Sequence, residues 1–443
     1  MIANQRTAHA LRALAASMAD QKHDHNGDFG YPEHINFPML YGMWDRNSLA
    51  GAGVSRISDT VWREMPRFQE QEVSHGETAQ EQLIRETFDD RRLWQKLAEA
   101  HMRSLVGDYG AAILRIADGK AWHEPVDSVA GGIEAIWDII PAWESQLVVS
   151  KWEQDQRSGN YGAPSLFQFN EVQIEDGKPR GTVRSMQIHP DRVLIWSSTG
   201  DTFGRSVLRH GFNSLIDYAK VIGAGGEGFW KAARSSMQLE VLPEAKLQDL
   251  AAAMGVPMDE LPDKLDEAVS DFVRGYDKSL MMQGIKATPV GVTLPANPEQ
   301  YYNGPLQAFA ASINCPSKVL IGNQTGERAS TEDERSWSQT CSARRDKTVK
   351  PIIMQMVERF ERWGVLPKAD WYLDWADLTD ASAAEKLDGA KKMAEINSAM
   401  LGTGELVFQP EEIREAAGWE QGEPDDEVPE GEPEAALPAA GLA

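Results

Sequence analysis

The sequence predicts an α+β fold, and three observations support that class. Apolar residues recur at helical spacing over residues 78–105. Short apolar runs separated by Gly, Pro and Asn follow up to about residue 200, a pattern typical of strands. From Arg205 onward the helical spacing returns. Strand-rich and helix-rich stretches in separate parts of a chain indicate α+β architecture.

Composition bounds the size and the partners of this protein. With 443 residues, 42% of them hydrophobic and 25% charged, the chain is an ordinary globular protein that can bury a large core. Lys and Arg number 44 against 68 Asp and Glu, so the formal charge is −24. A protein that wraps nucleic acid needs a concentrated basic surface, and this charge argues against one over the chain as a whole. A local basic stripe remains compatible with it.

Cysteine count and hydropathy limit the compartment. The two cysteines, Cys315 and Cys341, exclude a disulfide framework and a four-cysteine metal site, so we expect a cytosolic or phage-borne protein rather than a secreted one. No apolar run approaches the roughly 20 residues of a spanning helix, and residues 1–21 lack a signal-peptide core. We therefore expect no membrane partner.

The first 28 residues predict a short helix and a polar loop. Leu11, Leu14, Ala15 and Met18 recur at helical spacing. Residues 23–28 then read His-Asp-His-Asn-Gly-Asp, which contains metal-ligand residue types. Neither the spacing of a calcium loop nor a zinc-binding pair on a helix is present, so we expect no metal site here.

Residues 78–119 predict one helix followed by one strand. The apolar stripe over 78–105 indicates a single long packed helix. The run 111–116 is β-like and is closed by Asp118-Gly119. Four further strand candidates follow, at residues 146–150, 166–169, 183–188 and 192–196.

The next part of the chain predicts helices with a small mixed region between them. The helix that begins at Arg205 is expected to end in the glycine run 223–228. Residues 241–278 contain two short helical patterns broken by prolines, and residues 288–298 are proline-rich and extended. Another helical stretch, 299–313, precedes Cys315-Pro316.

A long kinked helix is predicted after residue 330. Thr331 and Glu334 fit a capping box, in which the Thr hydroxyl accepts the third amide while the Glu side chain reaches back. The helical pattern continues to about Trp363, polar in its first half and apolar on one face of its second half. Pro351 lies inside it, where the ring removes one amide donor and clashes with the preceding turn, so we expect a kink at 347–351.

The C-terminal part predicts a strand, two helices and an acidic tail. The expected elements are a strand at 371–375, a helix capped by Ser382 and Glu385 that ends near residue 402, and a short helix at 410–417. Residues 403–443 hold twelve acidic residues against one Arg, a net charge of −11. From residue 421 the composition is that of a disordered segment.

No motif in the chain favours an enzyme. The string Gly223-x-Gly225-x-x-Gly228 matches a dinucleotide fingerprint, but that motif follows a strand, and here a helix precedes it. The loop that begins at Gly322 lacks the Gly-Lys-Ser/Thr ending of a P-loop, and no nucleophile elbow or His-Glu-x-x-His helix is present. We predict no catalytic residue and no cofactor, and keep a nucleotide-dependent enzyme built on residues 223–228 as an alternative.

A short basic stretch lies on the predicted long helix. Arg344, Arg345 and Lys347 could contact phosphates or acidic neighbouring subunits. The simpler interpretation is a solvated helical face.

Three stretches of the chain form a characteristic series when they are taken in order. The first is residues 94–119, a helix that leads into Ala111-Ala112-Ile113-Leu114 and Asp118-Gly119. The second is Ile188-His189-Pro190-Asp191-Arg192-Val193-Leu194, followed by Phe203-Gly204-Arg205-Ser206-Val207-Leu208. The third begins at Ile313-Asn314-Cys315-Pro316, reaches Gly322, and continues with Pro351, Trp375-Ala376-Asp377-Leu378 and residues 412–418. Together they cover roughly residues 80–418, and their order and spacing resemble the tailed-phage portal proteins, the subunits of the head-to-tail connector ring.

The resemblance implies a portal-type fold with a mixed α/β wing, a helical stem, a small clip, a long kinked helix and a helical crown. The boundaries it implies are 1–204 for the N-terminal region and wing, 205–234 for the descending stem helix, 235–298 for the clip, 299–319 for the ascending stem helix, 320–331 for the tunnel loop, 332–380 for the long kinked helix and a wing strand, 381–420 for the crown and 421–443 for the acidic tail.

The resemblance also implies a function without catalysis. Such a protein forms a homo-oligomeric ring, usually of twelve subunits, at one capsid vertex, and double-stranded DNA passes through it transiently during packaging and ejection. Its implied partners are the terminase large subunit, a head-tail adaptor, and the major capsid and scaffold proteins. It belongs to the virion, and to the host cytoplasm during assembly.

The DNA-facing residues implied in the tunnel loop are Gly322, Asn323, Gln324, Thr325, Gly326 and Arg328. This loop departs from many relatives, which have a second Gly and an aromatic pair where this chain has Glu327-Arg328-Ala329-Ser330 before a lone Trp337. A capsid or scaffold interaction protein without a channel is the remaining hypothesis.

Overall fold

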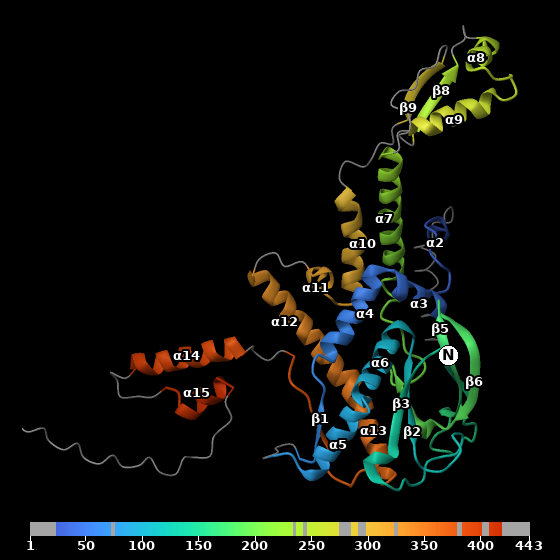
Figure 1. Cartoon of the computed structure of the whole chain (residues 1–443). Coiled ribbons are helices and arrows are strands. Elements are labelled where there is room, and N and C mark those ends of the chain that lie inside the picture. Colours follow the sequence, from blue (N-terminus) through green and yellow to red (C-terminus); the bar gives the residue numbers. More distant parts are fainter. Residues whose placement is uncertain are drawn as a thin grey trace, which may run out of the picture. The chain divides into compact units, whose positions relative to one another are not determined.

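The computed structural model describes residues 24–71, 76–233, 236–241, 246–273, 285–290, 298–322, 327–378, 383–400 and 407–418 (Figure 1). The chain divides into two compact units, Met1–Leu378 and Thr379–Ala443, which are described separately. Within the described ranges, no helix combines the length and the hydrophobicity that a membrane span requires. The predicted helix around residues 11–18 and His23 of the predicted polar loop lie outside these ranges.

Three helices that the sequence patterns did not reveal begin the first unit: α2 (His25–Asp28), α3 (Phe37–Arg46) and α4 (Ser48–Val61). Asparagine caps start the two longer ones, because the side chain of Asn36 accepts the amide of Met39 and that of Asn47 accepts the amides of Leu49 and Ala50. Helix α4 then buries an apolar stripe at helical spacing, which consists of Leu49, Ala50, Gly53, Val54, Ile57 and Val61.

The predicted single helix over residues 78–105 is wrong. Two helices occupy this stretch, α5 (Ala79–Asp90) and α6 (Leu93–Val106). They are separated because Arg92 adopts a left-handed conformation with φ 52°, which no α-helix continues through. Thr78 and Glu81 form the capping box that starts α5.

Two three-stranded antiparallel sheets follow. The first has the order β3-β2-β7, and the second has the order β4-β5-β6. Their bounds are β2 (Gly110–Ile116), β3 (Ile136–Trp143), β7 (Val193–Trp196), β4 (Leu147–Trp152), β5 (Pro164–Glu175) and β6 (Lys178–Ile188). The five strands expected from the sequence are confirmed, with β5 and β6 longer than expected, whereas β3 was missed.

Strand β2 is buried on both faces and connects the two larger hydrophobic cores of the first unit. Ala112 and Leu114 point into the main core, which α4, α6 and α13 share. Ala111 and Ile113 point the other way, into a smaller core with Phe167 of β5. Successive side chains of a strand alternate between faces, so an uninterrupted apolar run suits a strand with a core on either side.

Helices α7 (Phe212–Ala233) and α10 (Pro298–Ser312) pack side by side and run in opposite directions (Figure 1). A Cβ on Gly211, just before α7, would lie 2.5 Å from the ring of Phe309 near the end of α10, so only glycine permits this approach. The helix predicted from Arg205 to the glycine run has other bounds. Helix α7 begins at Phe212 and continues through residues 223–228 to Ala233, so the prediction that it ends in the glycine run is wrong.

Between α7 and α10 the chain forms a small α/β segment. It contains β8 (Ser236–Val241), α8 (Leu247–Met254), α9 (Leu261–Val273) and β9 (Ile285–Val290). Strands β8 and β9 pair antiparallel, Ser236 opposite Val290. The two expected short helices are confirmed, and the expected extended stretch includes part of β9.

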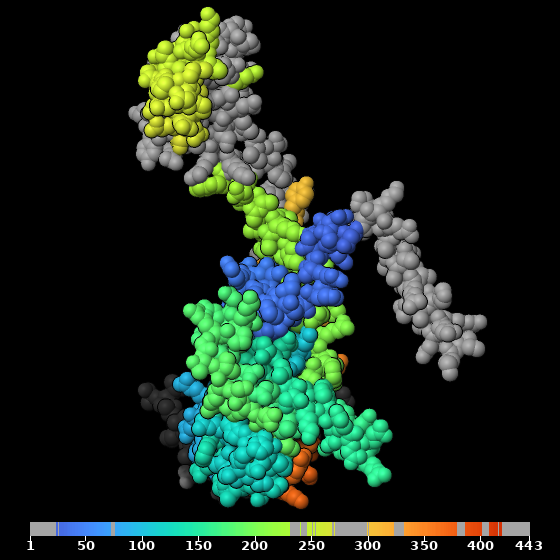
Figure 2. All heavy atoms as spheres, turned by 90° about the vertical axis from the view of Figure 1, so that its right-hand side faces the viewer, coloured from blue at the N-terminus to red at the C-terminus, as the bar shows by residue number. Residues whose placement is uncertain are grey.

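The N-terminal segment lies along α7. Tyr31 Oη donates a hydrogen bond to Asp217 Oδ2 at 2.5 Å, and Lys220 donates to the carbonyl of Phe29. Figure 2 shows the blue residues of this segment directly against the green residues of α7. The root of α7 is therefore held on one side by α10 and on another by residues 29–31.

The long helix is confirmed with different bounds. Helix α11 (Ser317–Ile321) precedes α12 (Glu327–Arg344), a π-helical segment η3 (Arg345–Val349) and α13 (Lys350–Arg362). Because α12 begins at Glu327, Thr331 and Glu334 lie inside the helix, and the predicted capping box is wrong. Trp371 and Trp375 flank β10 (Tyr372–Asp374), which pairs with β1 (Arg67–Gln69).

The second unit contains helices α14 (Ala383–Met400) and α15 (Pro410–Ala416), which pack together. The side chain of Asn397 joins them to the intervening segment: its amide donates to the carbonyl of Phe408 at 2.7 Å, and its oxygen accepts the amides of Val407 and Phe408 at 3.0 Å. Both predicted helices are confirmed, while Ser382 and the acidic tail 421–443 lie outside the described residues.

Candidate functional site

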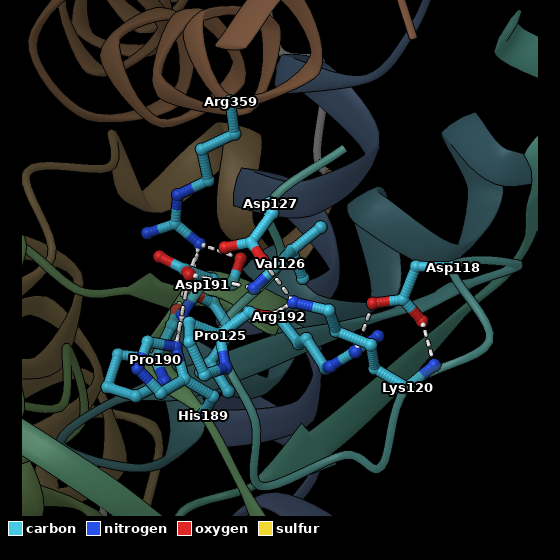
Figure 3. A network of polar contacts seen from close by, with 11 residues as sticks. Asp118, Lys120, Pro125, Val126, Asp127, His189, Pro190, Asp191, Arg192 and Arg359 are labelled. Carbon is cyan, nitrogen blue, oxygen red and sulfur yellow. Dashed lines mark hydrogen bonds and ion pairs between the residues drawn. The ribbon is translucent and has the colours of Figure 1, made fainter. Parts of the chain in front are cut away.

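The turn between β6 and β7 collects the charged residues of the second stretch singled out in the sequence (Figure 3). It is a 3-10 turn, η2 (Pro190–Arg192), which follows His189. The carboxylate of Asp191 lies 3.1 Å from His189 Nδ1 and accepts the amide of Val126 at 3.2 Å. The hydrogen bond with His189 is the main cause that lowers the pKa of Asp191. Asp191 is therefore anionic at neutral pH and fixes the turn.

Arg192 makes a fully buried ion pair below this turn. Its guanidinium donates to the carboxylate of Asp118, and the two side chains are 1% and 2% exposed. Asp118 closes strand β2, and Arg192 opens strand β7, so the pair connects the ends of two neighbouring strands. Removal of one partner would leave the other charge uncompensated in the interior.

Arg359 fastens α13 to the same turn. Its Nη1 donates to three backbone carbonyls, those of Pro190 at 3.1 Å, Asp191 at 2.8 Å and Val193 at 2.6 Å (Figure 3). Burial lowers the pKa of Arg359 to about 10, so the guanidinium remains charged at neutral pH. Figure 3 shows Arg359 reaching down from the helix toward the turn, which locks the long helix to the sheet.

The π-helical segment is fastened by Arg345. Its Nε donates to the carbonyl of Val61 at 2.7 Å, its Nη1 donates to the carbonyl of Ala376 at 2.6 Å, and the guanidinium lies 4.4 Å from the ring centroid of Trp375. Arg345 is 3% exposed, and burial lowers its pKa to about 10. The prediction that Arg345 contacts phosphates or a neighbouring subunit is wrong, because the protein's own interior holds this side chain.

The other residues of the basic stretch are less buried than Arg345. Arg344 is half-buried at the end of α12, and Lys347 is exposed in η3. Their proposed contacts stay predictions. Pro351 is the second residue of α13, directly after η3. A π-helical turn at this point widens the helix ahead of the proline ring, and the predicted kink itself stays a prediction.

The first half of the long helix is seated on α4. Trp337, 4% exposed, donates its indole N–H to Thr60 Oγ1 at 2.9 Å. Cys341 and Cys315 are buried free thiols nearby, and burial raises the pKa of both to about 12. Such thiols are neutral at physiological pH, so they pack as apolar groups and are poor nucleophiles.

A cavity of about 340 Å³ lies where α4, α11 and α12 meet, beside Gly322. Its charged lining alternates in sign, with Arg56, Arg63 and Lys318 among Asp59, Asp333 and Glu334. Gly322 ends α11 with φ 72°, a left-handed conformation that favours glycine.

Most of the predicted tunnel loop lies outside the described residues. This applies to Asn323, Gln324, Thr325 and Gly326. Arg328 belongs to the first turn of α12, but its side chain is also outside the description. Of the predicted range 320–331, residues 320–321 belong to α11 and residues 327–331 belong to α12.

Two kinds of ligand site are relevant here, a metal site and the nucleotide site of the alternative hypothesis. Among the described residues, no group of three or more His, Cys, Asp or Glu side chains could hold a metal ion. Residues 223–228 form continuous helix, whose amides are used within the helix, so the glycine run does not form the phosphate-binding turn of the nucleotide alternative.

Comparison with known proteins identifies which structural protein family this is. The sequence matches the phage portal protein family over residues 39–399. The chain therefore belongs to the phage portal protein family, and it is a portal ring protein with a portal-type fold. No curated protein matches the sequence.

Solved structures with similar chains come from phage-like particles. The neck of the native gene transfer agent particle, computed with C12 symmetry, contains a chain with 13% identity and a TM-score of 0.46, covering 86% of this chain and 92% of that one. The neck of the empty particle, with C6 symmetry, gives 16% identity and a TM-score of 0.48 over the same shares. An HK97 family phage portal protein from Corynebacterium diphtheriae gives 11% identity and a TM-score of 0.39, covering 75% of this chain and 94% of that one.

Sequence reasoning missed the roles of Arg359, Asp118 and Arg345 as anchors, although a signal for Arg359 was present. Arg359 is three residues after Met356 and four before Trp363, so it falls on the apolar face of the predicted helix, where a charged residue needs a buried partner. Asp118 was interpreted only as the end of a strand. Nothing in the sequence links Arg345 to the carbonyls of Val61 and Ala376, which are distant along the chain.

Proposed function

We propose that this protein assembles into a closed ring of twelve subunits at one vertex of a capsid, and that double-stranded DNA passes through the ring during packaging and ejection. The observation that carries this proposal is the antiparallel pair α7 and α10, which leads the chain into the segment β8–β9 and back. Membership of the portal family supports it.

The pair α7 and α10 serves as the stem in this proposal, and residues 236–290 serve as the clip. The contact of Gly211 with Phe309 supports this assignment, because it joins the start of the descending helix to the end of the ascending one. A stem joined in this way transmits force between the clip and the body. The helices of the second unit, α14 and α15, serve as the crown.

Residues 323–326 serve as the tunnel loop that faces DNA. The helices on either side of them supply the support: α11 ends at a left-handed Gly322, and α12 is seated on α4 through Trp337. Arg345 and Arg359 then fix the continuation of that helix. A short loop between two fixed helices can touch a moving ligand without rearranging the body.

The charge of the chain suits transient contact with DNA. A channel wall that gripped phosphates with many lysines would release counterions at each contact and resist passage. Of the formal charge of −24, residues 403–443 carry −11 and the rest carry −13. A ring of such subunits repels DNA on average, so neutral contacts from Asn323, Gln324 and Thr325, with Arg328 as a weak cationic contact, would guide DNA without holding it.

The partners in this proposal follow from the position of a portal. The clip docks the terminase large subunit during packaging and a head-tail adaptor afterwards, and the wing and crown contact the major capsid and scaffold proteins. The ring resides in the virion and is assembled in the host cytoplasm. The protein acts by geometry and electrostatics, without covalent catalysis.

The test is electron microscopy of the purified protein. Negative-stain averages should contain rings with twelve-fold symmetry and a central hole. A monodisperse monomer at micromolar concentrations would overturn the proposal, and a closed particle without a hole would favour a capsid or scaffold interaction protein.

A further inference from the structure

A second cavity, of about 400 Å³, opens at the root of the α7–α10 pair. Four parts of the chain meet around it: α4, the segment between β7 and α7, the turn between α10 and α11, and the last residue of α12. Its polar lining consists mainly of Ser198, Thr199, Arg205, His210, Asn314 and Arg344. We call this cavity the root pocket.

The root pocket is basic in a chain that is strongly acidic. Arg205, His210 and Arg344 line it, and none of its lining residues is Asp or Glu. This distinguishes it from the cavity beside Gly322, where bases and acids alternate. Asp108 and Asp201 hydrogen-bond to the lining residues Ser206 and Thr199 but do not line the pocket themselves. The lining therefore has an excess of basic groups, which suits an anion.

Arg344 is the central group of the pocket, and the described part of the chain gives it no hydrogen-bond acceptor. Its neighbour Arg345 has two carbonyl acceptors and a tryptophan ring. Burial lowers the pKa of Arg344, which shows that its charge is poorly solvated. A half-buried guanidinium without a partner is stabilised strongly by a carboxylate, which it can bind through two parallel hydrogen bonds.

We propose that the root pocket receives a carboxylate side chain from a second copy of this chain, the neighbouring subunit of the ring. This inference rests on the proposed ring. Subunits of a ring contact one another head to tail, so a site on one face of the subunit must be matched by a different face of the same chain. With a formal charge of −24, the chain supplies acidic groups for that face in excess.

A DNA phosphate is the less suitable occupant. A duplex presents a broad convex surface, whereas the pocket is a concavity enclosed by four parts of one subunit. A single side chain from a neighbour fits a cavity of this size, and Ser198 at its edge can donate a hydroxyl hydrogen bond to the second carboxylate oxygen. The position beside the root of α7 would also fix the angle of the stem between neighbours.

The test compares assembly of full-length variants. Arg344→Gln and, separately, Arg205→Gln remove one positive charge from the pocket, and Arg205 is an exposed loop residue whose replacement leaves folding intact. Arg362→Gln removes an equal charge from an exposed position on α13 and serves as the matched control. Sedimentation velocity across a protein concentration series gives the concentration at half-assembly for each chain, in 50 mM and 300 mM NaCl, and circular dichroism verifies folding.

We expect each pocket variant to raise the concentration at half-assembly about tenfold or more at 50 mM NaCl and to reduce its dependence on salt, because close interfacial charge pairs couple strongly. Arg344→Lys should retain part of the wild-type assembly, and Arg362→Gln should match wild type within twofold. Wild-type rings with unchanged assembly of both pocket variants would overturn the inference and leave the proposed ring intact.

Two other outcomes separate the alternatives. A wild-type chain that stays monomeric overturns the proposed ring and this inference together. Unchanged assembly with weaker binding of a 30-base-pair duplex by Arg344→Gln rings would assign the pocket to DNA phosphate and overturn the carboxylate.

Discussion

Helix α13 and the outer half of α7 differ in how far their apolar side chains are exposed. On α13, Ile353 and Met356 are almost completely buried, and the single arginine on that face is satisfied by three carbonyls. On α7, Ile222 and Phe229 are 49% and 54% exposed. Other parts of the same chain cover α13, whereas the described residues leave apolar side chains on the outer half of α7 exposed. The body is thus stable by its own contacts, whereas the outer half of α7 presents apolar side chains that a neighbouring chain could cover.

The largest expected effect concerns the buried ion pair of the body. Asp118→Ala leaves the guanidinium of Arg192 buried without its partner, so we expect the free energy of unfolding to fall by about 3–5 kcal/mol, measured by urea denaturation. The double variant Asp118→Leu with Arg192→Met should recover most of the loss, because an apolar pair of similar volume carries no desolvation cost. A loss below 1 kcal/mol for Asp118→Ala would contradict the view that this pair holds the strand ends together.

A somewhat smaller effect is expected at the helix anchor. Arg359→Met removes the donor of three carbonyls and should lower the free energy of unfolding by about 2–3 kcal/mol. Arg362→Met, three residues later on the exposed side of α13, should change it by less than about 0.5 kcal/mol. Equal effects of the two variants would show that α13 is held by its apolar face alone.

Acid should destabilise the body through His101. This side chain is fully buried, accepts the indole N–H of Trp62 on Nδ1 at 3.0 Å, and has its pKa lowered to about 3, mainly by burial. Because the folded pKa lies below the unfolded value of about 6.5, the stabilising contribution is complete above pH 6.5 and is lost as the pH falls toward 3. A difference of one pH unit corresponds to about 1.4 kcal/mol, so the free energy of unfolding should fall by about 2 kcal/mol between pH 7 and pH 5.

The measurement is urea denaturation of wild type and His101→Gln at pH 7 and pH 5. Glutamine can still accept the indole hydrogen bond but does not titrate, so its difference between the two pH values should be smaller by about 2 kcal/mol. The same acid sensitivity in both proteins would assign the effect to other groups.

How much of this could be predicted from the sequence differs between the two regions. The helical period found α7, α10 and the apolar face of α13, because each buries a regular stripe. It misjudged several boundaries, the start of α12 among them. Arg92 breaks a helix through its backbone conformation, which has no compositional signal. The glycines of α7 do not end the helix, because each costs only about 1 kcal/mol relative to alanine and the rest of the helix can offset that cost.

The candidate site was harder to predict than the fold. The basic stretch at 344–347 was found, but the sequence cannot separate Arg345, which points into the core, from Arg344, which lines a pocket, since adjacent helical residues differ by about 100° in direction. Strand β3 was missed because its position depends on tertiary contacts with β2 and α6, whereas α3 and α4 carry Asn caps and α4 an apolar stripe that the sequence already contained. The ion pair of Asp118 with Arg192 joins residues 74 positions apart and has no local pattern.

The smallest effect on folding and the sharpest contrast are expected along α7 itself. Ile222→Ser and Phe229→Ser replace exposed side chains, so each should change the free energy of unfolding by less than about 0.5 kcal/mol, whereas Leu215→Ala, at a fully buried position near the root of the same helix, should cost about 2–5 kcal/mol. Assembly should rank the variants differently. If neighbouring subunits cover the outer half of α7, Ile222→Ser and Phe229→Ser will raise the concentration at half-assembly several-fold in sedimentation velocity. The monomer of each variant should stay as stable as wild type. Rings that form equally well with both serine variants would mean that the outer half of α7 stays in water after assembly, and the difference between the two helices would then reflect tolerance of exposed apolar residues rather than an interface.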